Sequence, residues 1–454
     1  FNNSIDLEIS KSNLGEILIE GKTKQVYSFK SSDTKHHDHH VYVLSKDRIT
    51  AGDGVKSHQL VGKSILSTQT NCAIFEYLNA IGIRTHFVSR VAESNTDYKR
   101  SFIAKRCSMI PIEWVCRRIA TGSFLKRHPH VPEGYRFAPL KLETFFKDDA
   151  NHDPFWSEET LIGAKMNIGG MVITAEHVQE MFQITKLVFE VLERAWQTVN
   201  HSLIDMKIEF GVCEENGIKQ IVVADVIDND SWRLWPNGEK RLMLDKQVYR
   251  NMDNSKIDED ALNLVKANFE IVAERTQKLF NSLIPIRPDM TKIEGVIAPT
   301  VAIVVGSPSD KEYALKIKDT LMNRYKIYVV DIHVSSAHKS TQKTLELAAQ
   351  IQQWPSCKVV VAIAGMSNGL GPVLAANLPI PVISTPPTTD VSILQTDIWS
   401  SLRIPSGMST ATVIGADNTA IMCAQIVGTS DAFIWSTIRT LQTYQVIRLI
   451  HSRI

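Results

Sequence analysis

The chain has 454 residues, of which 44% are hydrophobic, so it is long enough for two or three domains that each bury a core. Its 50 lysines and arginines balance 49 aspartates and glutamates, and the formal net charge of +1 supplies no field for nucleic acid or an acidic membrane surface. No apolar run reaches the roughly 18 residues of a membrane span, and the polar start FNNSIDLEIS does not look like a secretory signal, so we expect a cytosolic protein without nucleic-acid or membrane partners.

The stretch EILIEGKTKQVYSF predicts a hairpin of strand, glycine turn and strand. Lys22 and Lys24 alternate with Thr23, so both lysines can face one side. Such a hairpin can place backbone N–H groups and ammonium groups over a triphosphate, although a solvated turn would have the same pattern. The stretch does not match the G-x-x-x-x-G-K-[ST] P-loop, so that mechanism is not supported.

The cysteines and histidines show no evident metal-binding pattern. The six cysteines include no C-x-x-C pair and are too sparse for a disulfide framework, which favours buried thiols in a reducing compartment. The run HHDHH at residues 36–40 lies between two strand-like segments and has no separated partner ligands. We therefore interpret this run as a solvated hairpin loop rather than a metal cluster.

Residues 174–200 have the apolar period of an amphipathic helix. One predicted face carries seven apolar side chains, those of Val178, Met181, Phe182, Val188, Phe189, Leu192 and Val199. A continuous apolar stripe is typical of a helix that faces a core, so we assign this helix to packing rather than to chemistry.

The next two segments predict charged strands. In LIDMKIEFG, residues 203–211, strand periodicity places Asp205, Lys207 and Glu209 on one face, a pattern that fits either a site or a solvated edge strand. The following stretch IKQIVVADVIDNDSWRLWP predicts an apolar strand that ends in three carboxylates with an arginine close behind. Carboxylates in that position suit Mg²⁺ held together with nucleotide phosphates.

These stretches resemble those of the SAICAR synthetase family, whose members are ligases of the purine pathway. Its two signatures look like PIEWVCRRIATGS and LIDMKIEFG, and its remaining blocks match EGKTKQVY, DRITAGDGVK and DVIDNDSWRLW in order. The similarity covers residues 4–284 and implies an α+β ATP-binding domain. The family uses ATP to join the carboxylate of carboxyaminoimidazole ribonucleotide (CAIR) to the amine of L-aspartate, which gives SAICAR, ADP and phosphate.

The resemblance also implies ligands for individual residues. It implies that ATP is bound by Lys22, Thr23, Lys24 and Lys105. It implies that CAIR is bound by Arg117, Ser123, Asp230, Ser231 and Arg233. The forked guanidinium of Arg117 suits carboxylate and phosphate, although an ion pair with Glu113 is the structural alternative.

The metal ligands that the resemblance implies are Glu209 and Asp225, which would hold Mg²⁺. They lie on successive strands joined through Asn216 and Gly217. A two-residue turn would pair residues 209 and 224 and send the two carboxylates to opposite faces. We therefore predict a three-residue loop with a left-handed glycine, or a bulge, which would restore a shared face.

Residues 284–300, IPIRPDMTKIEGVIAPT, contain three prolines and no clear period, so they predict a linker. We expect a first domain at residues 1–284, a linker at 285–299 and a second domain at 300–454. The second domain repeats strand, small-residue turn and helix, with continuous Val/Ile runs that predict parallel strands buried on both faces. This order predicts a doubly wound α/β sheet whose ligands bind beyond the carboxyl ends of the strands.

Three turns, GSPSD, SSAHKS and AGMSNGLGP, are expected at that edge. Ser307, Ser309 and Asp310 begin a predicted helix, where they could bind a phosphate or simply cap the helix. Together the three turns resemble the flavodoxin-like AIR carboxylase family, across residues 299–454. That family makes CAIR from aminoimidazole ribonucleotide (AIR), so the second domain would supply the substrate of the first.

The carboxylase resemblance implies that AIR and CO₂ are bound by Ser307, Ser309, Asp310, Ser336, Gly365, Ser367 and Asn368. Members that rearrange N-carboxylated AIR usually have Ser-Ala-His-Arg and a second histidine. Here Lys339 follows His338, and Asn368 stands in a loop without histidine, which resembles the direct carboxylases. We expect His338 to remove the ring proton after CO₂ addition and Lys339 to stabilise the new carboxylate, without ATP or biotin.

The fused order resembles the bifunctional purine enzymes of animals. The last segment, DAFIWSTIRTLQTYQVIRLIHSRI, has apolar residues on more than one helical face, which suggests a subunit contact, and the family forms homo-octamers through this domain. The resemblance is also compatible with an association with other purine-pathway enzymes. Two alternatives stay open, which are a mutase chemistry in the second domain and a catalytically silent nucleotide-binding scaffold.

Overall fold

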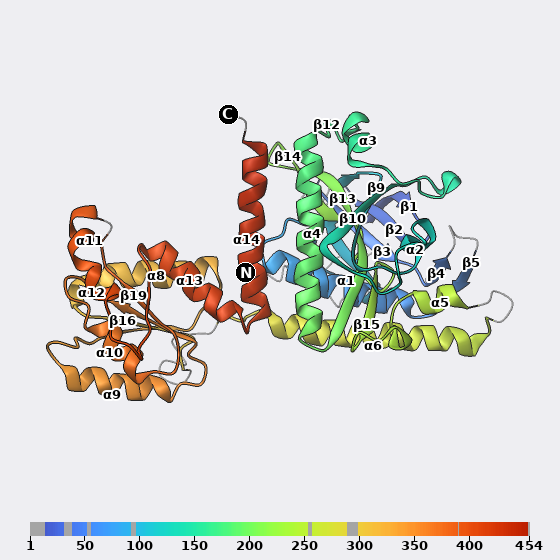
Figure 1. The fold of residues 1–454 in the computed structure, drawn as a ribbon. Coiled ribbons are helices and arrows are strands. Elements are labelled where there is room, and N and C mark those ends of the chain that lie inside the picture. Colours follow the sequence, from blue (N-terminus) through green and yellow to red (C-terminus); the bar gives the residue numbers. More distant parts are fainter. Residues whose placement is uncertain are drawn as a thin grey trace. The chain divides into compact units, whose positions relative to one another are not determined.

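The computed structural model of the chain forms two compact units (Figure 1). The first contains residues 1–284 and 439–454, and the second contains residues 285–438. The residues that the structure describes are 14–30, 39–51, 56–91, 97–252, 257–287, 298–388 and 390–452. Most of the HHDHH run and of the expected linker lies outside the described residues. Among the described helices, none has the length and apolar character that a membrane span requires.

The first unit contains a five-stranded antiparallel sheet in the order β1-β2-β3-β7-β6. Its strands are β1 (Leu14–Glu20), β2 (Lys24–Phe29), β3 (His40–Ser45), β6 (Phe87–Arg90) and β7 (Ser101–Lys105). Helix α1 (Lys63–Ala80) packs against β3, β6 and β7 and against helix α6 (Glu259–Leu283). The predicted lysine hairpin is the β1–β2 pair, whose turn is closed by the N–H of Gly21, which donates to the carbonyl of Lys24 at 2.9 Å.

A second antiparallel sheet is built around the long strand β13, which pairs with β8, β9, β14 and β15, while β10 pairs with β9. Its strands are β8 (Cys107–Met109), β9 (Ile112–Ile119), β10 (Arg136–Phe146), β13 (His201–Glu215), β14 (Ile218–Ala224) and β15 (Trp232–Pro236). Because β13 has neighbours on both sides, its charged residues do not form a solvated edge face.

Helix α4 (Ala175–Gln197) packs against β9, β10 and β13 with the predicted apolar face. Its fully buried members are Val178, Met181, Val188, Phe189 and Leu192. Val199 lies beyond the last helical residue and is 39% exposed, so the face ends before this position. The smaller elements of the unit are β4 (Arg48–Ala51), β5 (Lys56–Gln59), β11 (Asn167–Ile168), β12 (Met171–Val172), α2 (Ser123–Arg127), α3 (Glu158–Gly163) and α5 (Gln247–Asn251), with 3-10 turns at Tyr98–Arg100, Asp149–Asn151 and Lys240–Leu242.

The β13–β14 hairpin differs from the prediction. Glu209 pairs with Ala224, and Asn216 and Gly217 form a two-residue turn, so the predicted three-residue loop or bulge is wrong. Both turn residues have positive φ, 52° and 75°, as a tight hairpin turn requires. Asp225 follows the strand with φ 64°, a left-handed conformation, so the alternation of the strand does not extend to it. Because this left-handed residue redirects the chain, Glu209 and Asp225 line the same cavity.

The second unit is a five-stranded parallel sheet with helices on both faces, which confirms the predicted doubly wound fold (Figure 1). In sheet order its strands are β17 (Val330–Val334), β16 (Val301–Val305), β18 (Val359–Ile363), β19 (Val382–Thr385) and β20 (Ala411–Thr412). Its helices are a 3-10 turn at Pro308–Asp310, α8 (Lys311–Arg324), α9 (Thr341–Gln352), α10 (Leu370–Asn377), α11 (Val391–Asp397), α12 (Trp399–Leu402) and α13 (Ala416–Gly428). Helices α9 and α10 share one core with β16 and β18, and α8 packs with α13.

One predicted strand lies in a different place from that expected. The residues before SSAHKS were expected to form a strand buried on both faces, but β17 is at the edge of the sheet, and Val334 at its end is 59% exposed. The stretch SSAHKS therefore follows an edge strand. Its turn still lies at the carboxyl ends of parallel strands, beside the turn that follows β16.

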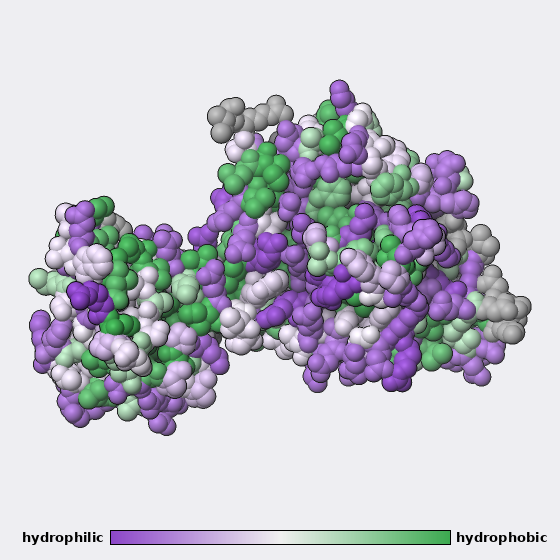
Figure 2. All heavy atoms as spheres, in the orientation of Figure 1, coloured by the Kyte–Doolittle hydropathy of each residue, from purple (hydrophilic) through white to green (hydrophobic). Residues whose placement is uncertain are grey.

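Helix α14 (Ala432–His451) begins in the second unit, but its residues from 439 onward belong to the first, although we expected them in the second domain. Arg439 pairs with Glu190 at 2.8 Å and His451 with Glu180 at 2.7 Å, both on α4. Of the apolar residues in the segment that suggested a subunit contact, Phe433, Ile434, Ile438 and Ile447 are buried within this chain. Figure 2 shows hydrophilic residues over much of the visible surface, with smaller hydrophobic groups between them.

Candidate active sites

A cavity of about 1810 Å³ in the first unit gathers the charged residues of both sheets. Its lining includes the predicted ATP, CAIR and metal residues Lys22, Thr23, Lys24, Arg117, Ser123, Glu209, Asp225, Asp230, Ser231 and Arg233. Lys105 does not line this cavity, because its ammonium group pairs with Glu215 at 2.8 Å on a half-exposed part of the sheet. Residues more than 200 positions apart thus meet in one place.

The β1–β2 hairpin contributes the ammonium groups at one side of the cavity. The Nζ atom of Lys22 lies 2.8 Å from Oδ2 of Asp149, and Lys24 forms an ion pair with Asp225. Burial lowers the pKa of Lys24 to about 8, against the attraction of Glu209 and together with the repulsion of Lys147. An ammonium group partly removed from water interacts more strongly with an anionic group than a fully solvated one does.

Carboxylates and ammonium groups alternate around the predicted metal position. Glu209 accepts from Lys147 at 2.8 Å and from Lys207 at 3.2 Å, and Lys207 also contacts Glu113. Burial opposes ionisation of Glu209, but the ammonium groups of Lys207 and Lys147 lower its pKa, so it carries a charge at neutral pH. Within the described part of the chain, no three His, Cys, Asp or Glu side chains are grouped to hold a metal ion. Two carboxylates nevertheless match the hard oxygen donors that Mg²⁺ takes when phosphates complete its shell.

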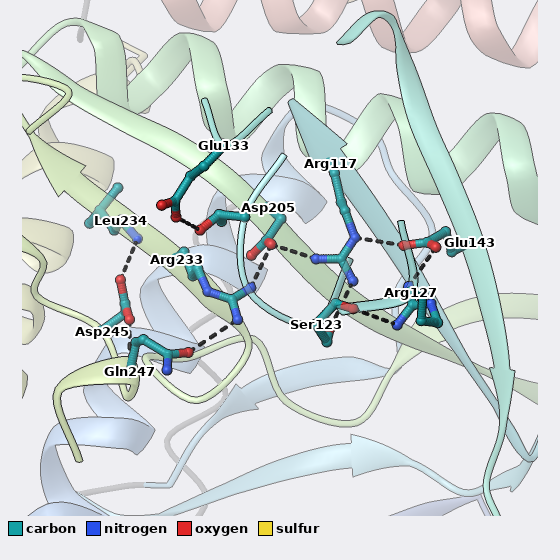
Figure 3. A network of polar contacts seen from close by, with 11 residues as sticks. Arg117, Ser123, Arg127, Glu133, Glu143, Asp205, Arg233, Leu234, Asp245 and Gln247 are labelled. Carbon is teal, nitrogen blue, oxygen red and sulfur yellow. Dashed lines mark hydrogen bonds and ion pairs between the residues drawn. The ribbon is translucent and has the colours of Figure 1, made fainter. Parts of the chain in front are cut away.

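A buried arginine network also lines the cavity (Figure 3). Asp205 accepts from Arg117 at 2.7 Å and from Arg233 at 2.6 Å through the same oxygen. Arg117 also donates to Glu143 at 2.6 Å, and Glu143 accepts in turn from Arg127. The ion pair with Glu113 that we considered for Arg117 is absent from the described contacts, because Glu113 binds Lys207. The network holds two guanidinium groups at the cavity wall, where their remaining donors suit a phosphate or carboxylate.

The Asp230 loop closes the cavity beside this network. Asp230 pairs with Lys63 at 2.9 Å, and the N–H of Asp230 donates to Asp228 at 2.9 Å. Burial opposes ionisation of Asp230, but Lys63 and Lys246 lower its pKa. The hydroxyl of Ser231 donates to the carbonyl of Val226 at 3.1 Å. Both Asp230 and Ser231 therefore have internal partners that hold the loop in place.

Several residues of this site carried no assignment from the sequence. Asp205 was noted only as part of a charged face, whereas Lys63, Arg127, Glu143 and Lys147 were missed. Arg127 lies four residues after Ser123 on one short helix, which is a spacing that could have suggested it. The other three come from elements distant in sequence, and no local pattern marks them.

In the second unit, the turn after β16 forms the first part of a candidate site. The hydroxyl of Ser309 donates to Ser307 at 2.8 Å, and the N–H of Ser309 donates to the same oxygen at 3.4 Å. Asp310 stands at the N-cap of α8 but makes no side-chain cap bond, and burial raises its pKa. The capping role that we considered thus belongs to Ser307, which caps the short 3-10 turn.

The turn after β17 places His338 and Lys339 on the surface. Ser336 accepts from the N–H of Lys339 at 3.3 Å, which orders the turn. The imidazole of His338 packs on Gly369, where a Cβ atom would lie 2.8 Å from Nε2. In the described part of the chain His338 makes no hydrogen bond, so the structural role of bonding the backbone finds no support there.

The loop after β18 completes the group of turns. Asn368 is only 4% exposed, and its amide group donates to Ser401 at 2.9 Å and accepts from the N–H of Gly371 at 2.9 Å. Its side chain therefore supports the loop, and Ser367 and Gly365 are the more accessible members of the predicted set. Gly365 lies beside Pro387, 3.6 Å from the position that a Cβ atom would take.

Comparison with known proteins finds two family models in the chain. Residues 17–264 match SAICAR synthetase, and residues 300–446 match AIR carboxylase. A protein of Drosophila melanogaster, named bifunctional phosphoribosylaminoimidazole carboxylase/phosphoribosylaminoimidazole succinocarboxamide synthetase, is 48% identical over 426 residues, which cover 94% of this chain and 92% of that protein. The Homo sapiens protein of the same name is 46% identical over 427 residues, covering 94% and 93%. A solved structure described as SAICAR synthetase (Type-2) in complex with ADP has 29% identity and a TM-score of 0.47, covering 58% of this chain and 98% of that one.

Proposed function

The chain belongs to the family of bifunctional purine-biosynthesis enzymes that join a SAICAR synthetase to an AIR carboxylase, and from that premise we propose roles for the residues of its two sites. The carboxylase turns AIR and CO₂ into CAIR, and the ligase consumes CAIR together with ATP and L-aspartate. The observation that carries the ligase proposal is that Lys24, Arg117, Glu209 and Asp225 line one cavity.

In the ligase, the reaction requires an activated carboxylate, because a carboxylate does not react with an amine directly. The CAIR carboxylate attacks the γ-phosphorus of ATP, which releases ADP and leaves an acyl phosphate. The amine of aspartate then attacks the acyl carbon, loses a proton and displaces phosphate. Lys22 and Lys24 neutralise the phosphate charge, and the guanidinium groups of Arg117 and Arg233 with Ser123 orient CAIR.

Glu209 and Asp225 are proposed to hold Mg²⁺. Their lysine partners Lys24 and Lys147 compensate the two carboxylate charges, and those ammonium groups can turn to the triphosphate when a cation takes their place. A bound Mg²⁺ would supply additional neutralisation of phosphate charge. Asp230 and Ser231 keep the loop beside CAIR in place through Lys63 and Val226.

In the carboxylase, the electron-rich ring carbon of AIR attacks CO₂, which forms the new C–C bond. The ring carbon then carries both a proton and a carboxylate, and His338 removes that proton to restore the aromatic ring. The ammonium group of Lys339 stabilises the carboxylate. Ser307, Ser309 and Asp310 with the turns of Ser336 and Ser367 are proposed to bind AIR. Neither ATP nor biotin takes part, since the ring itself is the nucleophile.

A coupled assay tests the whole proposal. The full chain receives AIR, bicarbonate, ATP, Mg²⁺ and aspartate, and the formation of SAICAR is measured. His338→Asn keeps the size of the side chain but removes the titratable nitrogen, so carboxylation should fall by roughly 100- to 10,000-fold, the usual effect of a positioned acid or base. Ligation of supplied CAIR should stay unchanged.

The outcomes separate the alternatives. Turnover of AIR with bicarbonate but without ATP excludes the mutase chemistry, and formation of SAICAR excludes the silent scaffold. If His338→Asn carboxylates AIR at a rate within a few-fold of the parent rate, the proposed role of His338 is contradicted. Lys339 would then be tested in the same way.

We also propose that the chain assembles into homo-octamers through its carboxylase unit. Its described surface exposes several large apolar side chains on the loop after β18 and on α11 and α12, namely Met366, Val391, Trp399 and Leu402. Exposed apolar residues in this number are typical of a protein interface. Light scattering of the full chain would measure the mass of the assembly, and a monomer would contradict the proposal.

A further inference from the structure

The loop between β18 and α10 has an unusual backbone at the candidate carboxylase site. Met366 has φ 55°, a left-handed conformation that costs a residue with a side chain roughly 1–2 kcal/mol. Its side chain is 83% exposed, so packing against the core does not hold it there. Other contacts must keep the loop in this conformation.

Those contacts come from the corner between the short helices α11 and α12. The N–H of Met366 donates to Oδ2 of Asp397 at 2.7 Å, a bond strengthened by the carboxylate charge. Ser400 accepts from the N–H of Asn368 at 2.9 Å, and its own hydroxyl donates to the carbonyl of Asp397 at 2.8 Å and, more weakly, to that of Met366 at 3.3 Å. Ser401 accepts from the side chain of Asn368 at 2.9 Å.

The loop of residues 366–369 ends at Gly369. The imidazole of His338, which is the proposed base, packs on this glycine. A Cβ atom at Gly369 would lie 2.8 Å from Nε2 of His338, so the imidazole lies directly against this backbone, and the position of the loop shapes the surface on which the imidazole packs. Asn368, one residue earlier, also accepts from the N–H of Gly371 and so joins the loop to the start of α10. The corner of α11 and α12 is therefore connected to His338 through the backbone of residues 366–369.

From this arrangement we propose that Asp397 and Ser400 are positioning residues of the carboxylase, which hold the 366–369 loop so that His338 reaches the ring proton of AIR. The inference rests on the proposed carboxylase function. Neither residue takes part in the chemistry itself. Proton transfer depends steeply on geometry, so a misplaced base lowers the catalytic rate more than it lowers substrate affinity.

The test compares matched variants of the full chain. Asp397→Ala removes the acceptor of the Met366 N–H, and Ser400→Ala removes the acceptor of the Asn368 N–H. Each should lower kcat for carboxylation by about 10- to 100-fold, the effect of losing a hydrogen bond to a charged or structural acceptor, with KM for AIR within about 3-fold. Asp397→Asn keeps an oxygen acceptor of the same size and should recover most of the rate.

Two controls keep the result specific. Asp390→Ala changes a carboxylate at the other end of α11, where it caps the helix by accepting from Ser392 at 2.9 Å, and carboxylation should stay within about 3-fold. Ligation of supplied CAIR by each variant reports whether the ligase unit still folds. The melting of the carboxylase unit in each variant shows whether the lost rate follows from lost stability.

The proposal is overturned if Asp397→Ala keeps carboxylation within about 3-fold, or if Asp397→Asn is as slow as Asp397→Ala, because the acceptor alone would then not explain the effect. It is also overturned if Asp390→Ala loses as much rate as Asp397→Ala, since helix stability would then be the cause. The variant His338→Asn separates the two hypotheses. Normal carboxylation by that variant contradicts the role of His338, whereas its loss together with normal Asp397→Ala contradicts only the positioning role.

Discussion

The two candidate sites differ in how their charged groups are held. In the first unit, Arg117 and Asp205 are almost fully buried, and each charge has partners from other strands. In the second unit, His338 and Lys339 lie exposed on a turn, and the order of the site comes from backbone hydrogen bonds to α11 and α12. The ligase site is thus part of the core of its unit, whereas the carboxylase site is attached to the surface of a core. Substitutions in the first should cost stability as well as activity, and those in the second mainly activity.

The largest effect is expected for Asp205→Ala. This change leaves Arg117 and Arg233 buried without their shared carboxylate, and breaking a buried ion pair costs about 3–5 kcal/mol. The free energy of unfolding of the ligase unit should fall by that amount, and ligation should be lost, while carboxylation of AIR persists. Urea denaturation of the full chain, followed by both activities, measures the difference.

The control for this experiment is Glu20→Ala, which removes an exposed partner of Lys46 and should leave the free energy of unfolding nearly unchanged. Equal losses in the two variants would contradict the view that the ligase site is part of the core. Loss of carboxylation in Asp205→Ala would show that the two units do not unfold independently.

The two units also differ in how much of their structure could be predicted from the sequence. In the parallel sheet, topology brings the carboxyl ends of neighbouring strands together, so local motifs such as GSPSD and SSAHKS were enough to predict the group of turns. The edge position of β17 could not be predicted, because no single segment of the sequence determines the order of the strands in a sheet. The supporting residues Asp397 and Ser400 were missed for a related reason, since their helices carry no pattern that connects them to the loop.

In the ligase site, the sequence identified the charged strand and the lysine hairpin but not their partners. Glu143 meets Arg117 of β9, and Lys147 meets Glu209 of β13, only through the pairing of separate strands. Glu209 and Asp225 line one cavity, but the predicted loop or bulge is absent, and the regular alternation is broken at the left-handed residue Asp225. The φ angle of a single non-glycine residue depends on tertiary contacts, and the periodicity of a sequence does not reveal it.

The second prediction concerns the end of the chain. Ile447 on α14 is 3% exposed and belongs to the first unit, whereas Leu449 on the same helix is 72% exposed. Ile447→Ala should lower the stability of the ligase unit by about 2–4 kcal/mol, the usual cost of truncating a buried aliphatic side chain. Leu449→Ala should change it by less than about 0.5 kcal/mol. Thermal denaturation read by ligase activity checks both, and equal effects would show that residues 439–452 do not support the ligase core.

The third prediction uses the pKa of Lys24. Burial lowers this pKa to about 8, so the ammonium form that binds phosphate is present below that pH and is lost as pH rises through it. We expect kcat/KM for ATP to fall as pH rises through this value, since kcat/KM reports the free enzyme. Lys24→Arg, whose charge does not titrate in this range, should remove that limb of the profile, whereas Lys46→Arg should leave it unchanged. A limb that persists in Lys24→Arg would assign it to another group.

The smallest effect is expected for Lys105→Ala, and it tests the boundary of the ligase site. The resemblance to the ligase family placed Lys105 among the ATP residues, but its ammonium group pairs with Glu215, and both side chains are at least 30% exposed. An exposed ion pair of this kind contributes about 0–1 kcal/mol, so kcat/KM for ATP should change by less than about 3-fold. Lys24→Ala in the same assay gives the contrasting loss that a phosphate ligand inside the cavity should produce. A decrease of more than about 100-fold for Lys105→Ala would return this residue to the ATP site, and the site would then extend beyond the cavity along β7 toward Glu215.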